Sequence, residues 1–476
     1  MTTGVDGLDT VLGGGLLEGR AYIIQCQPGA GKTILANQIC FHHAAAGGKA
    51  LYVTLLAESH ARMIENLSSL EFLEPSLVPD GVYYISGHPA LKEGLDSLVR
   101  LLRGEIRRHG TTLMVLDGLL NVREAAGSGL DFREFMQNLQ GQADFAGCTV
   151  LMLTSTGLPA ASPEHTMVDG VIELTDDLSG VRTTRHLTVT KHRGGPHLRG
   201  LHQFDIVERG IAVYPRLEAR YGHPSRSDTA GTGRMSSGIE TLDAMLGGGL
   251  PAPSMTLVLG ASGTGKTTTG LHFLARSSPT EPGLYFGFYE TPPRLLSKAA
   301  AVGLDLGGLV DQGAVEILWQ PPTENLLDGL GYRLLEAVDR RGVRRLVIDG
   351  IGGFERASEH PRRLLAFLTA LTNELRARGV TTVASWELRQ MLGSSIEAPA
   401  VEISSLVENM VALRFVELQA RVHRILAVMK VRDGAYDSQL REFEITDRGI
   451  ELASAPDGAE VLLGGFAHGR DEQASR

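Results

Sequence analysis

Short runs of apolar residues alternate with segments of helical spacing along the whole chain. Two such runs, 21–26 (AYIIQC) and 255–260 (MTLVLG), lead into glycine-rich loops, and helical spacing follows at 34–45 and 268–277. Further runs have the length and composition of buried parallel strands: 50–56, 112–117 and 148–155 in the first half, and 283–289, 345–349 and 381–385 in the second. Alternating strands and helices predict an α/β fold with a doubly wound, mostly parallel sheet.

The two halves of the chain repeat the same sequence blocks in the same order. The opening TGVDGLDTVLGGGLLE at 3–18 returns as SGIETLDAMLGGGLPA at 237–252, and the glycine-rich loops lie 234 positions apart. Late in each half, the β-rich segments 182–195 and 421–434 predict a closing β-hairpin. We therefore expect two tandem copies of one domain, with these boundaries: 1–219 for the first domain, 220–235 for a linker, 236–453 for the second domain and 454–476 for a C-terminal tail.

Composition narrows the class of protein. Of the 476 residues, 43% are hydrophobic and 21% are charged, which is enough to bury a core in each domain. The net charge of −10 argues against a nucleic-acid-coating protein, because those are usually basic. Three cysteines do not suit a disulfide framework and fit a reducing compartment. The polar start lacks a signal peptide, and the charge-free stretch 244–264 is interrupted by Gly, Pro and Ser. We expect a cytoplasmic protein with neither a membrane span nor a specific nucleic-acid partner.

The second glycine-rich loop, GASGTGKT at 260–267, fits the phosphate-loop pattern in full and lies between a strand and a helix. Its backbone N–H groups are expected to surround the phosphates of ATP, with Lys266 on the β and γ phosphates. The Thr267 hydroxyl is expected to bind Mg²⁺. The expected ATP-binding residues are Gly260, Ser262, Gly263, Thr264, Gly265, Lys266, Thr267 and Thr268.

The first loop, CQPGAGKT at 26–33, has Cys26 where the pattern has its first glycine. The remaining pattern is intact, so we expect ATP binding here too, by Gly29, Ala30, Gly31, Lys32 and Thr33, with Thr33 also on Mg²⁺. A redox-sensitive Cys26 is one hypothesis. A small buried residue is the favoured alternative.

Carboxylates at strand ends supply the remaining chemistry of a nucleotide hydrolase. Asp117 and Asp349 each end an apolar run and are expected to hold the Mg²⁺ shell of the loop threonine; the alternative is a turn-capping role. Glu58 and Glu290 follow the next strand after each loop helix, and together with Lys32 and Lys266 they are the catalytic candidates. An acid that merely initiates a helix is the alternative for both glutamates.

A Lys-x-Arg pair occurs late in each copy, as Lys191 with Arg193 and Lys430 with Arg432. Residues i and i+2 of a strand face the same way, so both cations point at one target. A neighbouring subunit's γ-phosphate is the expected target, as for an arginine finger. A solvated basic edge is the alternative, and repetition in both copies favours the functional interpretation.

Together these residues resemble the KaiC family, the double-domain branch of RecA-like ATPases. The shared features are the openings with LD-x-x-LGGGL, the two phosphate loops, the Asp-ending strands and the Lys-x-Arg pairs. The resemblance implies two tandem RecA-like P-loop NTPase domains and a hexamer of two stacked rings with ATP between subunits. It also implies that the two Lys-x-Arg pairs reach ATP across that interface.

In clock members of the family the second domain is a serine/threonine autokinase and autophosphatase. The resemblance places Ser404 and Ser405 on the two phosphate-acceptor positions; the alternative is that they are turn or capping residues. Those members carry two adjacent glutamates at the catalytic strand end, whereas this chain has Ala57-Glu58 and Tyr289-Glu290. The departure bears on kinase chemistry more than on ATP hydrolysis.

The leading hypothesis is an oligomeric ATPase that acts as a signalling or regulatory switch, with possible serine autophosphorylation in the second domain. Its expected partners are other copies of itself and regulatory proteins such as a KaiB-like protein or a sensor kinase. Two alternatives belong to other classes: a DNA-strand ATPase of the recombinase or helicase type, and a non-catalytic nucleotide-sensing scaffold. A role in a clock does not follow from the family, because members also occur outside circadian systems.

Overall fold

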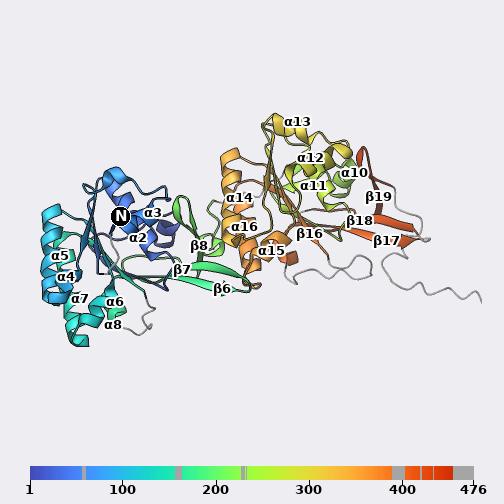
Figure 1. Ribbon diagram of the computed structural model, residues 1–476. Coiled ribbons are helices and arrows are strands. Elements are labelled where there is room, and N and C mark those ends of the chain that lie inside the picture. Colours follow the sequence, from blue (N-terminus) through green and yellow to red (C-terminus); the bar gives the residue numbers. More distant parts are fainter. Residues whose placement is uncertain are drawn as a thin grey trace, which may run out of the picture. The chain divides into compact units, whose positions relative to one another are not determined.

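The computed structural model describes residues 1–55, 60–155, 163–226, 231, 233–388, 403–418, 421–432 and 434–453. The chain divides into two compact units, Met1–Arg220 and Tyr221–Arg476 (Figure 1). Among the described residues, no helix combines the length and the apolar character needed to cross a membrane.

The first unit is built on a nine-stranded sheet in the order β3-β2-β4-β5-β1-β6-β7-β8-β9. The strands from β3 to β6 are parallel, and β6 to β9 run antiparallel. The strands are β1 (Ala21–Cys26), β2 (Ala50–Thr54), β3 (Val82–Ser86), β4 (Leu113–Asp117), β5 (Thr149–Thr154), β6 (Gly170–Ser179), β7 (Arg182–His192), β8 (His202–Val207) and β9 (Gly210–Tyr214).

Helices cover both faces of this sheet, because alternate residues of each buried strand point to opposite sides. Tyr22 and Ile24 of β1 pack in the core under α2, whereas Ala21 and Ile23 pack in the core under α5 and α7. The helices are α1 (Leu8–Val11), α2 (Lys32–Ala45), α3 (His60–Leu67), α4 (His88–Glu93), α5 (Leu95–His109), α6 (Leu119–Ala125), α7 (Gly129–Ala146), α8 (Pro163–Met167) and α9 (Leu217–Arg220), with a 3₁₀ turn at Pro75–Leu77.

The second unit repeats this architecture. Its main sheet has the order β14-β13-β15-β16-β12-β17-β18-β19-β20, with the same switch from parallel to antiparallel at β17. The strands are β10 (Gly233–Met235), β11 (Leu250–Ala252), β12 (Met255–Gly260), β13 (Gly283–Gly287), β14 (Val315–Trp319), β15 (Arg345–Asp349), β16 (Thr381–Glu387), β17 (Asn409–Leu418), β18 (Arg421–Val431), β19 (Arg441–Thr446) and β20 (Gly449–Leu452).

Helices also follow the same plan in this unit. The helices are α10 (Glu240–Met245), α11 (Lys266–Leu274), α12 (Pro292–Ala301), α13 (Leu306–Asp311), α14 (Leu327–Arg341), α15 (Gly352–Ala357), α16 (Arg363–Ala377) and α17 (Ile403–Leu406). Two tandem RecA-like α/β domains are therefore confirmed as the fold class, and each has its hairpin, β6–β7 or β17–β18.

Part of the expected linker is attached to the second unit. The backbone N–H and the hydroxyl of Ser225 donate to the two carboxylate oxygens of Glu374 at 2.6 and 2.7 Å. Glu374, on α16, is fully buried and also accepts from the Arg378 guanidinium. A buried carboxylate needs such donors, so this contact fixes the chain where it enters the second unit.

Candidate functional site

The second phosphate loop connects β12 to α11. Gly263 and Gly265 have φ angles of 80° and 107°, a left-handed conformation that favours glycine. These turns bring the chain directly into α11, whose first residue is Lys266. The Lys266 ammonium folds back onto the Ala261 carbonyl at 2.7 Å, and burial lowers the pKa of this lysine. The loop therefore presents a helix N-terminus and a cation to the same space, which suits an anionic group.

Asp349 ends β15, and its carboxylate accepts hydrogen bonds from three hydroxyl groups on different elements. Thr267, the second residue of α11, donates to Asp349 Oδ2 at 2.9 Å, and Tyr285 on β13 donates to the same oxygen at 2.6 Å. Ser385 on β16 donates to Oδ1 at 2.6 Å and accepts the N–H of Gly350 at 2.8 Å. The threonine and aspartate predicted to hold Mg²⁺ thus lie in direct contact, and neighbouring strands fix the carboxylate's orientation.

A cavity of about 1290 Å³ opens beside this network. Six of the eight residues expected from the second loop line it, Ser262, Gly263, Gly265, Lys266, Thr267 and Thr268, and so do Glu290 and Asp349. Gly260 is not one of the described lining residues. Thr264 is different, because its side chain is fully buried and its hydroxyl donates to the Ala261 carbonyl at 2.8 Å. Sequence reasoning missed several polar residues that also line the cavity: Tyr289, Lys298, Glu355, Arg356, Ser385 and Glu387.

Glu290 lies just after the C-terminal end of β13 and forms an ion pair with Lys298 of α12. One carboxylate oxygen, Oε1, takes the lysine, while Oε2 is buried with no hydrogen-bond partner among the described residues. The adjacent Tyr289 is exposed, and the Arg356 guanidinium lies over its ring at 5.3 Å. Glu290 therefore lines the cavity with one carboxylate oxygen that has no hydrogen-bond partner among the described residues.

The first phosphate loop has the same backbone arrangement. It connects β1 to α2, Lys32 begins the helix, and Gly29 and Gly31 have φ angles of 90° and 102°. The Tyr52 hydroxyl donates to Asp117 Oδ2 at 2.9 Å, as Tyr285 does to Asp349. Glu58, the candidate base of this copy, lies outside the described residues.

Cys26 is a buried residue at the end of β1. Its exposed fraction is 3%, and burial raises the pKa of its thiol. A thiol with a raised pKa is a poor nucleophile at neutral pH. The environment therefore favours the small buried residue over the redox-sensitive cysteine.

Both Lys-x-Arg pairs hold the end of a short helix. In the first unit, Lys191 donates to the carbonyls of His165 and Thr166, and Arg193 donates to that of Thr166 at 3.2 Å. Cations at a helix C-terminus bind its unpaired carbonyl groups favourably. Lys191 and Arg193 thus both bind carbonyl groups at the end of α8, in their own chain.

The second unit repeats this contact at the candidate phosphate-acceptor residues. Lys430 donates to the carbonyls of Ser404 and Val407, and Arg432 to that of Ser405 at 2.8 Å. Both serines are exposed residues of α17. Among the described residues, neither the serines nor the two cations line the cavity beside Lys266.

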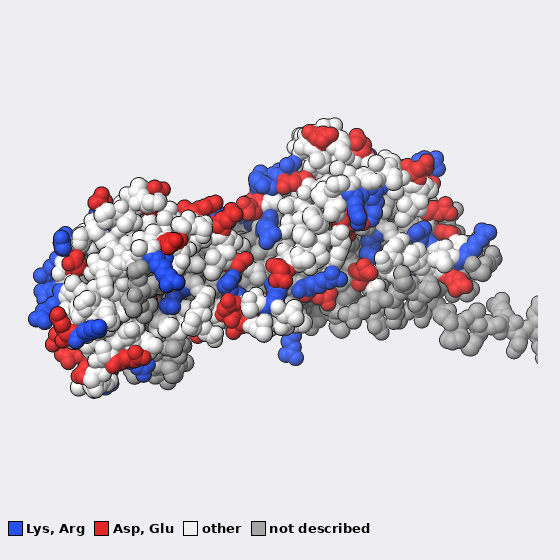
Figure 2. Space-filling view, viewed as in Figure 1, with Lys and Arg blue, Asp and Glu red and all other residues white. Residues whose placement is uncertain are grey.

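The surface charge shows no segregation on the face drawn in Figure 2. Lys and Arg side chains are interspersed with Asp and Glu over both units on that face. This distribution agrees with the balance of 45 basic and 55 acidic residues in the sequence.

Comparison with known proteins gives a consistent result. The family model described as "ATPase: KaiC" matches residues 1–218 and again 235–457. The "Circadian clock oscillator protein KaiC" of Picosynechococcus sp. is 26% identical over 97% of this chain and 91% of the relative. The "Circadian clock protein KaiC3" of Synechocystis sp. is 25% identical over 98% of this chain and 94% of the relative. Both matches cover the two units and their phosphate loops, and the chain belongs to the KaiC family of ATPases.

Proposed function

We propose that this protein binds Mg-ATP at both phosphate loops, hydrolyses it, and uses the nucleotide state as a regulatory switch. The observation that carries the proposal is the contact of Thr267 with Asp349 on the wall of a cavity that also contains Lys266 and Glu290. These four residue types are the parts that phosphoryl transfer from ATP requires.

Each residue of the second site has a distinct task in this proposal. The N–H groups at the start of α11 and the Lys266 ammonium bind the phosphates and offset the charge that develops on them. Thr267 and Asp349 would hold Mg²⁺, which neutralises the β and γ phosphates when bound. Glu290 orients the attacking water and accepts its proton. Lys298 keeps the Glu290 carboxylate at the edge of the cavity through their ion pair.

The proposed active form is a homo-oligomer, and by its resemblance to the family a hexamer. Arg193 and Arg432 are exposed at the ends of β7 and β18, and Lys191 and Lys430 are half-buried beside them. These four cations would leave the helix carbonyls and contact ATP bound by the neighbouring subunit. Partner proteins, of a KaiB-like or sensor-kinase type, would then read the nucleotide state of the ring.

Serine autophosphorylation in the second unit is a further part of the proposal. Ser404 and Ser405 are exposed hydroxyl-bearing residues held by Lys430 and Arg432, the same residues assigned to the neighbour's phosphate. Glu290 would act without a second glutamate, because Tyr289 precedes it. Loss of general-base assistance costs roughly 10²–10⁴-fold, so the transfer is expected to be slow.

Incubation with labelled ATP tests these activities in one preparation. Phosphate release, light scattering with and without Mg-ATP, and peptide mass spectrometry of the 403–418 segment are measured on the same sample. The proposal expects turnover, nucleotide-dependent assembly and phosphate on Ser404 or Ser405. Turnover without phosphate on either serine removes the kinase activity and leaves an ATPase switch. A stable complex with single-stranded DNA, weakened by salt, would instead support a DNA-strand ATPase.

A further inference from the structure

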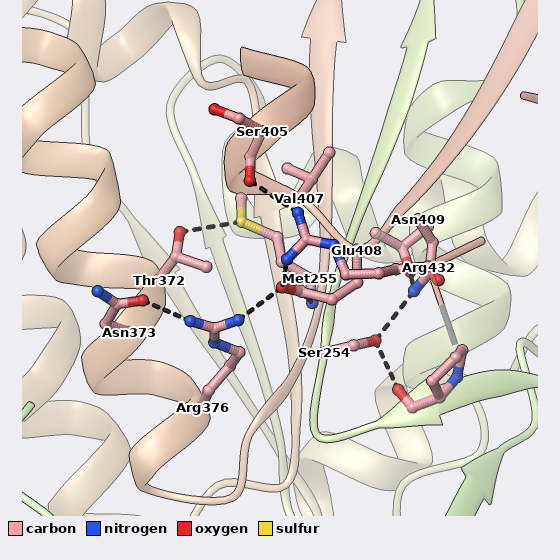
Figure 3. Close-up of polar contacts among 12 residues, drawn as sticks. Ser254, Met255, Thr372, Asn373, Arg376, Ser405, Val407, Glu408, Asn409 and Arg432 are labelled. Carbon is pink, nitrogen blue, oxygen red and sulfur yellow. Dashed lines mark hydrogen bonds and ion pairs between the residues drawn. The ribbon is translucent and has the colours of Figure 1, made fainter. Parts of the chain in front are cut away.

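Glu408 is a buried carboxylate between α17 and β17, and its exposed fraction is 5%. Its Oε2 accepts the backbone N–H of Met255, the first residue of β12, at 2.8 Å. Its Oε1 accepts Nη1 of Arg376, on α16, at 2.6 Å (Figure 3). A buried carboxylate is tolerated only with such partners, so the ion pair with Arg376 provides most of the charge compensation for Glu408.

A second arginine approaches the same oxygen less closely. Arg432 Nη1 lies 3.6 Å from Glu408 Oε1, beyond hydrogen-bonding distance, while Arg432 Nη2 donates to the Ser405 carbonyl at 2.8 Å. The Arg432 side chain is 43% exposed and that of Arg376 23%. Arg376 therefore holds the hydrogen-bonding position on Glu408, and Arg432 is left at a longer ion-pair distance on the exposed side.

Arg376 is itself fixed in place. Its Nη2 donates to Asn373 Oδ1, one turn earlier on α16, while Nη1 binds Glu408. Figure 3 shows the guanidinium extended between these two acceptors. A planar guanidinium that is held at two nitrogens is more strictly oriented than one held at a single nitrogen.

We propose that Arg376 and Glu408 are positioning residues for Arg432. The negative charge of Glu408 attracts Arg432 to its place beside Ser405. Because Arg376 already occupies the hydrogen-bonding position on Glu408, Arg432 does not form a closed ion pair, that is, a hydrogen-bonded one, with this carboxylate. Arg432 is thereby oriented and still available to an incoming phosphate. This inference rests on the proposed function of Arg432 at ATP of a neighbouring subunit.

The arrangement is specific to the second unit. In the first unit, Asp169 takes the place of Glu408: its carboxylate accepts the N–H of Ala21 at 3.2 Å and its carbonyl accepts that of Arg193 at 2.8 Å. The residue in the position of Arg376 is Asp144, an exposed acid on α7. Among the described residues, a second arginine therefore lies beside this carboxylate in the second unit, whereas the first unit has an acid in the place of that arginine.

The test is the dependence of ATP turnover on ATP concentration in the full chain carrying Lys32→Ala, in which turnover reports the second unit alone. Arg376→Met removes the competing cation, so Arg432 forms a hydrogen-bonded ion pair with Glu408. A smaller fraction of the protein molecules then has Arg432 available to contact ATP. The expected result is a KM for ATP about tenfold higher with kcat within about twofold, because apparent affinity falls with the competent fraction. Arg340→Met, which removes the same charge from an exposed pair with Glu316, is the control and is expected to leave KM unchanged.

A double variant separates positioning from a structural role. In Arg376→Met/Glu408→Gln the closed pair cannot form, so KM is expected to return to within about twofold of the wild type. If Arg376 only stabilises the fold, the double variant will be as impaired as the single one or more so, and the inference fails. If Arg376→Met does not fold, Arg376→Gln replaces it, with the same expected increase in KM and the same recovery in the double variant.

Arg432→Ala distinguishes failure of this inference from failure of the proposed function. If Arg432→Ala reduces turnover while Arg376→Met matches the Arg340→Met control, the positioning role is wrong and the proposed function stands. If Arg432→Ala leaves turnover and assembly unchanged, Arg432 has no role at a phosphate, and both this inference and the proposed interfacial role of Arg432 are overturned.

Discussion

The two phosphate loops differ at a coupled pair of positions. A Cβ atom on Gly260 would lie 2.5 Å from Thr264 Oγ1 and 2.7 Å from the Leu413 carbonyl oxygen. In the first loop the corresponding residues are Cys26 and Ala30, both buried. Because alanine lacks the hydroxyl, the first of these two contacts is absent in the first loop, which contains the larger residue Cys26. The first glycine of the pattern is therefore required by its close neighbours, Thr264 and Leu413, and not by its own backbone conformation, because its φ angle lies outside the left-handed region.

The two strand-end aspartates also differ in their surroundings. A tyrosine hydroxyl donates to each, from Tyr52 or from Tyr285. Opposite Asp349 on the next strand is Ser385, which donates to it, whereas Leu153 holds the matching place opposite Asp117. The tyrosine is thus common to both units, and Ser385 gives Asp349 a hydroxyl group from the second adjoining strand as well.

The largest expected effect concerns the interface cations. Arg432→Ala in a chain that also carries Lys32→Ala reports the second unit alone, and Arg193→Ala with Lys266→Ala reports the first. Each is expected to lose about 10³-fold in phosphate release, the loss expected for an arginine finger. An unequal response would show that the units use their Lys-x-Arg pairs differently. Unchanged rates in both, with a monomer by light scattering in Mg-ATP, would contradict interfacial catalysis.

Ser385→Ala should reveal the difference in the magnesium site. Removing one donor from Asp349 loosens its orientation, and changes of this kind cost about 10-fold in metal affinity. The Mg²⁺ concentration for half-maximal turnover is measured in the Lys32→Ala background, with Ser385→Thr as the control that keeps a hydroxyl. Equal Mg²⁺ dependence for Ser385→Ala and the unmodified chain would mean that Tyr285 and Thr267 suffice.

Exchanging the loop residues gives the smallest expected effect. Gly260→Cys forces its side chain against Thr264 and is expected to destabilise the second unit by about 1–3 kcal/mol. Thr264→Ala alone is the control, and Gly260→Cys/Thr264→Ala should recover much of the loss, because it copies the first loop. Thermal unfolding of the four proteins measures this. If the double variant is no more stable than Gly260→Cys, the two positions are not coupled.

Sequence alone predicted the fold because its signals are local. The phosphate loops and the apolar runs each occupy a few consecutive residues, and the repeat consists of such short blocks that return in the same order. Lys266, Thr267 and Asp349 could be named from them. Lys298, Ser385 and Arg356 reach the cavity from separate elements, so their position depends on how helices pack on the sheet.

The repeat holds a further signal that pattern reasoning missed. Tyr52 and Tyr285 occupy matching places in β2 and β13, and each contacts the strand-end aspartate. Arg376 offers no such signal, because the first unit has Asp144 in that place, whereas the acid is repeated as Asp169 and Glu408. Residues that are specific to one copy become visible only through their tertiary contacts.

The number of nucleotides bound per chain tests the central claim most directly, because the claim is that both loops bind Mg-ATP despite Cys26. Calorimetric titration of the wild type is expected to give two nucleotides per chain, and Lys32→Ala and Lys266→Ala are each expected to give one. A stoichiometry of one for the wild type that is unchanged by Lys32→Ala would contradict the account, because the first loop would then not bind nucleotide.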